Sequence, residues 1–156
     1  HYIFTAEHTR MSVERSLKRL KTDYLDCVLA HCPRDDVRVI SDTPVLDTLA
    51  ALKTEGKIRS FGASIHTVEG GRLAVDRADA VMVAYNKDHT SERAVIDYAR
   101  EKGRAVLVKK GLGSGHIQDA AAAVRFVVET DGVTSLVFGS LNPANILSNI
   151  KALIKD

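Results

Sequence analysis

Five short apolar segments, each separated from the next by a segment with helical periodicity, constrain the fold of this chain more than any other feature. The apolar segments span residues 25–30, 58–63, 80–84, 104–109 and 133–139. Their length is typical of strands, and the segment AVMVA at 80–84 is apolar throughout, as expected for a strand covered on both faces. Strands that alternate with helices indicate a parallel sheet built from βαβ units.

The segments between these strands carry helix start and stop signals. Val13, Leu17 and Leu20 recur at helical spacing in the first of them. Thr43 and Pro44 predict an N-cap followed by a proline in the first turn. The predicted helices span residues 5–20, 43–56, a shorter stretch from 67, 91–102, 119–130 and a last stretch from 142.

Two architectures accept this order of elements. A five-stranded, doubly wound parallel sheet closes its core at about this length, whereas a (β/α)8 TIM barrel needs ~200 residues or more and eight strands. Length favours the doubly wound sheet. No linker or low-complexity segment divides the chain, so residues 1–156 are predicted to form a single domain.

Composition and charge exclude several classes of function. The formal net charge is +2 and aromatic residues make up 5% of the chain, so no basic, aromatic surface for nucleic acid is expected. No apolar run reaches the ~20 residues that span a membrane. The sequence has two cysteines, Cys27 and Cys32, and Cys27 is expected to point into a packed face. This pattern suggests neither a disulfide framework nor a metal site. We therefore expect a cytoplasmic protein that binds neither nucleic acid, nor membrane, nor metal.

Polar residues follow every predicted strand, at the end where parallel α/β proteins bind their ligands. A doubly wound sheet concentrates its site at one switch point, whereas a barrel uses all of its strand ends, so this distribution favours the barrel. The residues are His31 after the first strand, Ser64 and His66 after the second, Tyr85 and Asn86 after the third, Lys109 and Lys110 after the fourth, and Gly139 and Ser140 after the fifth.

Four stretches, in order, resemble the aldo-keto reductase family. SVERSLKRLKTDYLDCVLAHCP resembles the helix and strand that end on the family's catalytic histidine, and GKIRSFGAS resembles the next strand. AYN follows the third strand, and GVTSLVFGSLNPANILSNI resembles the family's last strand and helix. The resemblance implies a (β/α)8 barrel, of which this chain covers about the last five βα units, and an NADP(H)- or NAD(H)-dependent reductase of aldehydes and ketones.

The resemblance also implies roles for individual residues. His31 corresponds to the active-site histidine, which hydrogen-bonds the substrate carbonyl. Ser64 corresponds to the serine that holds the nicotinamide carboxamide, while Ile65 and Met82 replace an asparagine and a glutamine of the family pattern. Asn86 is expected to hold its loop rather than touch the cofactor.

The remaining cofactor contacts are expected at two glycine-containing turns. The turn after the fourth strand carries two lysines, where a tyrosine is common in the family, and its backbone suits a pyrophosphate. The turn after the fifth strand leads into a helix N-terminus, which favours a phosphate. The predicted contacts are Lys109, Lys110, Gly113, Ser114, Gly139, Ser140, Asn145 and Asn149; the last two match adenosine-end positions of the family.

The family's catalytic aspartate, tyrosine and lysine have no counterpart here, and the role of the tyrosine is not transferred to Tyr2. We expect roughly 100 further residues before His1, including a tyrosine general acid, from the usual length of a barrel. Five strands of an open barrel leave two unpaired edges, which favours self-association.

The alternative function is a non-catalytic relative that binds cofactor or acts as a scaffold. A hydrolase using Cys32 and His31 is disfavoured because adjacent strand residues point to opposite sides; an exposed Cys32 thiol is expected to be open to oxidation.

Overall fold

Five parallel strands form one curved sheet in the computed structural model, which describes residues 2–154. The strands are β1 (Leu25–His31), β2 (Ile58–Ser64), β3 (Ala80–Ala84), β4 (Ala105–Lys109) and β5 (Ser135–Leu136). They lie in the order β1-β2-β3-β4-β5, and every neighbouring pair is parallel. In a doubly wound sheet, the spatial order of the strands reverses at a switch point. The strand order here does not reverse, so the doubly wound alternative is wrong.

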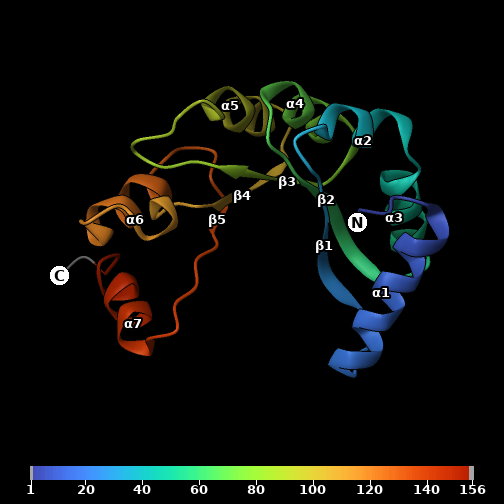
Figure 1. Ribbon diagram of the computed structural model, residues 1–156, viewed down its shortest axis with the longest axis horizontal. Coiled ribbons are helices and arrows are strands. Elements are labelled where there is room, and N and C mark those ends of the chain that lie inside the picture. The colour runs from blue at the N-terminus through green and yellow to red at the C-terminus, as the bar shows by residue number, and fades with distance from the viewer. Residues whose placement is uncertain (1, 155–156) are drawn as a thin grey trace.

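The helices cover the outer, convex side of the sheet, and the structure curves into an arch with α1 and α7 at its two ends (Figure 1). Successive crossovers in one direction place their helices on one face, as in a barrel. The helices are α1 (Ala6–Leu20), α2 (Asp36–Asp42), α3 (Val45–Thr54), α4 (Val68–Arg77), α5 (Arg93–Glu101), α6 (Ala120–Val128) and α7 (Pro143–Lys151), with a short 3₁₀ turn at Gly113–Gly115.

The register of the strands separates the sheet into two faces. Side chains alternate along a strand, so the pairs Val81–Val106 and Val83–Val108 share one face, and all four are fully buried in the core beneath the helices. The pairs Leu29–Gly62, His31–Ser64 and Ala84–Lys109 share the other face. That second face is the concave one, and it carries the candidate functional residues.

Most predicted elements are confirmed, with three exceptions: the N-cap of α3, the additional helix α2 and the length of β5. Thr43 and Pro44 do not cap a helix as predicted: Pro44 is the N-cap of α3 without a side-chain cap, and Thr43 Oγ1 donates to the carbonyl of Val39 at 2.6 Å. That carbonyl belongs to α2, a helix absent from the prediction because its seven residues are too few to show periodicity. The fifth strand is also shorter than predicted, since only Ser135–Leu136 pairs with β4.

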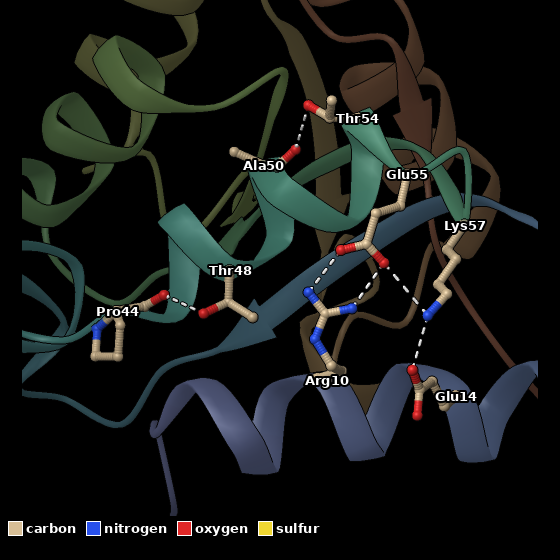
Figure 2. A network of polar contacts seen from close by, with 8 residues as sticks. All are labelled: Arg10, Glu14, Pro44, Thr48, Ala50, Thr54, Glu55 and Lys57. Atoms are coloured by element: carbon tan, nitrogen blue, oxygen red, sulfur yellow. Dashed lines mark hydrogen bonds and ion pairs between the residues drawn. The ribbon is translucent and has the colours of Figure 1, made fainter.

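A network of charged side chains fastens α1 to the end of α3 (Figure 2). Arg10 donates two hydrogen bonds, each of 2.7 Å, to the carboxylate of Glu55. Lys57 donates to Glu14 at 2.7 Å and lies 3.3 Å from Glu55. The hydrogen bond from Arg10 is the main cause that lowers the pKa of Glu55 to about 2. The two helices are therefore joined by ion pairs at the outer surface.

None of the helices within residues 2–154 is both long enough and apolar enough to cross a membrane.

Candidate active site

His31 and Ser64 lie side by side at the carboxyl end of the sheet. They are register partners on β1 and β2, so their side chains share the concave face. His31 is exposed, whereas Ser64 is only 3% exposed. The ring of Tyr2 lies beside the imidazole, with 6.0 Å between the two ring centroids. The imidazole is therefore open to a ligand on the concave face, while the neighbouring hydroxyl is largely covered.

Lys109 reaches from β4 to Ser64 across the intervening strand. The strand β3 lies between β2 and β4, and its residue Ala84 is the register partner of Lys109. The side chain of Ala84 is small. The Lys109 ammonium donates to Ser64 Oγ at 2.8 Å and to the carbonyl of Ile65 at 3.0 Å. Burial lowers the pKa of Lys109, and repulsion from Lys110 lowers it further. The ends of β2 and β4 thus meet in one polar cluster, next to the end of β1.

Asp36 anchors the turn that follows Ser64, a role that the sequence analysis missed. Its fully buried carboxylate accepts hydrogen bonds from the backbone N–H groups of His66 at 2.6 Å and Thr67 at 2.8 Å, and from Thr67 Oγ1 at 2.7 Å. Thr67 in turn caps α4 by accepting from the N–H of Gly70 at 3.0 Å. A Cβ on Gly70 would lie 2.5 Å from the Asp36 carboxyl carbon, so the site admits only glycine there.

A pocket of about 670 Å³ lies between the turn after β4 and the start of α7. That volume is within the usual range for small-molecule sites, about 300–1,000 Å³. Six of the predicted cofactor contacts line it: Lys110, Ser114, Gly139, Ser140, Asn145 and Asn149. Gly113 lies in the same turn without lining the pocket, while Ser64 and Lys109 form the separate cluster described above.

The two ends of this pocket have distinct backbone features. Ser114, in the 3₁₀ turn, has a φ of 57°, in the left-handed region that few non-glycine residues adopt. At the other end, Asn142 caps α7 by accepting from the N–H of Ala144 at 3.0 Å. Ser140 Oγ accepts from the N–H of Asn142 at 3.1 Å and from the side-chain amide of Asn145 at 3.3 Å. The predicted residues Ser140 and Asn145 are therefore in direct contact.

Both cysteines differ from their predicted environments. Cys27 was expected in a packed face but is exposed, because it lies on the concave face with Leu29 and His31. Cys32 was expected to be an exposed thiol but is fully buried, and burial raises the pKa of its thiol to about 11. Exposed His31 and buried Cys32 confirm that adjacent residues point to opposite sides, so they do not form a nucleophile and base.

Asn86 holds its own loop. Its side-chain amide donates to the carbonyl of Lys110 at 2.9 Å, and its side-chain oxygen accepts from the N–H of Asp88 at 3.0 Å. The bond to Lys110 ties the turn after β3 to the turn after β4, and so fixes one wall of the pocket.

A curved parallel sheet with helices on its convex side, and polar groups at the carboxyl ends of its strands, defines an α/β protein of the TIM-barrel class. The model of the aldo/keto reductase family matches residues 1–121. This chain belongs to the aldo/keto reductase family, and its five βα units form part of the family's barrel.

Comparisons with solved structures and curated relatives agree with this assignment. The structure superimposes with a TM-score of 0.92 on a Pseudomonas aeruginosa protein assigned to the aldo-keto reductases, at 42% identity over 97% of this chain and 61% of that one. An aldo-keto reductase from Bacillus halodurans shares the fold with a TM-score of 0.85 at 18% identity, over 99% of this chain and 64% of that one.

Methylglyoxal reductase DkgB of Yersinia pestis is 28% identical over 90% of this chain and 59% of its own length. The 6-dehydroglucose reductase of Agrobacterium fabrum is 26% identical over 85% of this chain and 48% of its own length. The chain therefore spans about half to three fifths of these curated relatives.

Proposed function

We propose that the protein is an NAD(P)H-dependent oxidoreductase that reduces aldehyde or ketone groups. One observation carries the proposal. His31 and Ser64 are register partners on the open face at the carboxyl end of the sheet. They correspond to the family residues that bind the substrate and the cofactor. Two of the relatives are named methylglyoxal reductase and 6-dehydroglucose reductase, which supports a carbonyl compound as substrate.

The side chains and turns around the pocket fit a phosphate-bearing dinucleotide. Lys110 supplies a positive charge, Ser114 and Ser140 supply hydroxyl groups, and Asn145 and Asn149 supply amides that both donate and accept. At Gly139 an added Cβ would meet nothing within 4 Å, so the backbone there is open to a ligand. The bound nicotinamide cofactor would supply the hydride that reduces the carbonyl carbon. Among the described residues no arginine lines the pocket, and both NADP(H) and NAD(H) are candidate cofactors.

His31 would bind and orient the substrate. An imidazole N–H that donates to the carbonyl oxygen places the carbonyl carbon on the concave face and stabilises negative charge as it develops on that oxygen. Ser64 would hold the cofactor carboxamide, with its position fixed by Lys109 on one side and by the turn that Asp36 anchors on the other. The proton would come from a tyrosine outside this chain, as the family pattern implies.

Turnover of small aldehydes by the whole protein tests this proposal. Oxidation of NADPH or NADH is followed by absorbance with the wild type, His31→Gln and His89→Gln. His31→Gln is expected to lower kcat/KM by about 100-fold, the usual scale for a polarising side chain. His89, an exposed histidine beyond β3 that pairs with Glu92, is the matched control, and its replacement should have little effect. Equal activity of all three proteins would refute the role of His31, whereas saturable cofactor binding without turnover would favour the non-catalytic alternative.

A further inference from the structure

Lys109 and Lys110 are neighbours in the sequence but face different parts of the site. Lys109 ends β4 on the concave face and is half-buried, with its ammonium on Ser64 and Ile65. Lys110 is exposed, has a φ of 58° and lines the pocket between the β4 turn and α7. Both lysines were predicted to contact the cofactor, and one of them to contact phosphate; Lys110 lines the pocket, whereas Lys109 lies in the separate cluster with Ser64.

The positive charge of Lys109 is held by neutral groups. An ammonium has three N–H donors. Two of them are directed at the Ser64 hydroxyl oxygen and the Ile65 carbonyl oxygen, neither of which carries a negative charge. These two groups do not cancel the charge, while the carboxylates of Glu92 and Asp36 act on the ammonium from further away and weaken its field without removing it. Partial burial reduces the screening by water.

The bond to Lys109 also orients the Ser64 hydroxyl. Because Ser64 Oγ accepts from the ammonium, its own hydrogen remains available to donate, and since Ser64 is only 3% exposed, a ligand must pack closely against it to accept that hydrogen. A carboxamide oxygen bound there at an ordinary hydrogen-bond length of about 2.8 Å would lie within about 6 Å of the Lys109 nitrogen. The nicotinamide ring to which the carboxamide is attached would then lie within about 8 Å of that charge.

We propose that Lys109 binds at the nicotinamide end of the cofactor and favours its reduced form over its oxidised form. This inference rests on the proposed function. The oxidised ring carries a positive charge and the reduced ring is neutral, so a nearby ammonium repels only the oxidised form. Over about 8 Å in a partly buried site, this repulsion corresponds to roughly tenfold in affinity. Selective binding of the reduced cofactor favours carbonyl reduction over alcohol oxidation.

Lys110 provides the contrast within the same chain. The phosphate groups of the cofactor are identical in the two redox forms, so a cation that contacts them strengthens the binding of both forms by the same factor. The two lysines therefore differ in a measurable quantity, the ratio of the dissociation constants of the oxidised and reduced cofactors.

Titration calorimetry of the whole protein with NADPH and with NADP⁺, repeated with NADH and NAD⁺, measures that ratio without turnover. The wild type is expected to bind the reduced form more tightly, and Lys109→Met to lower the ratio about tenfold. Lys109→Gln removes the charge while keeping a donor for Ser64, so it should lower the ratio equally. Lys110→Met should weaken both forms by one common factor and leave the ratio unchanged.

Different outcomes refute the two proposals. Equal affinity of the wild type for both forms, or an unchanged ratio in either Lys109 variant, overturns the role of Lys109 while leaving the cofactor site intact. Absence of saturable binding of any of the four dinucleotides to the wild type overturns the proposed function, and the role of Lys109 with it.

Discussion

Replacement of Asp36 tests whether the turn after Ser64 depends on a buried carboxylate. Asp36→Ala removes three accepted hydrogen bonds, from the N–H groups of His66 and Thr67 and from the Thr67 hydroxyl. Each donor in this partly buried turn loses its partner, at a cost of roughly 1 kcal/mol per bond. We therefore expect Asp36→Ala to lower the free energy of unfolding by about 3 kcal/mol.

The amide variant separates the shape of the side chain from its charge. Asp36→Asn keeps an oxygen for the two backbone N–H groups, and its NH₂ group can donate to the Thr67 hydroxyl instead of accepting from it. Only the charge-assisted part of the bonds is then lost, so a smaller decrease of about 1 kcal/mol is expected. The contacts thus predict that the wild type is the most stable, Asp36→Asn is intermediate and Asp36→Ala is the least stable.

Urea unfolding of the whole protein, followed by circular dichroism, measures these differences as shifts of the midpoint at constant slope. Asp35→Ala is the matched control, because Asp35 is an exposed neighbour that forms only a surface ion pair with Arg38. Its loss should cost less than about 1 kcal/mol. If Asp36→Ala were no more destabilising than Asp35→Ala, the carboxylate would not anchor the turn, and the reasoning would be refuted.

Three further predictions concern separate parts of the structure. Cys32, buried and with a thiol pKa of about 11, should react with iodoacetamide only on unfolding in a Cys27→Ser protein; fast labelling of the native state would contradict its burial. Glu55→Gln should lower Tm at neutral pH, and this difference should vanish as the pH falls from 4.5 towards 2, because the lowered pKa of Glu55 makes its contribution disappear on protonation. Gly62→Ala should cost about 3 kcal/mol in chemical unfolding, because its Cβ would lie 2.0 Å from a carbonyl oxygen of β3; the Gly139→Ala control should be neutral.

Periodicity was enough to predict the strands and most helices, because each depends on neighbours within one turn or one strand. Its limits appear at α2 and Asp36. The helix α2 has seven residues, and the partners of Asp36 lie 30 and 31 positions away in the chain. An acidic residue after a strand looks like an ordinary loop residue, and only the fold reveals that it is buried. A helix beginning at Thr67 was predicted, but the carboxylate that binds Thr67 was not.

Knowledge of the covered face would have corrected both cysteine predictions. Cys27 alternates with Leu29 and His31, which lie on the concave face, so it is exposed with them. Cys32 continues the alternation of Val28 and Ala30, which contact the core, and so it is buried. The sequence shows which residues share a face but not which face the helices cover, since both faces of these strands contain apolar residues.

The same separation of faces explains why substitutions in one strand should have different consequences. Val106 and Val108 of β4 are fully buried beneath the helices, so shortening them leaves cavities and lowers stability. Lys109, the next residue, lies on the concave face and contacts Ser64 across β3. Its reach depends on the small side chain of Ala84, its partner on the intervening strand. The strand thus contributes to stability through one set of alternate residues and to the site through the other, and the two contributions can be altered independently.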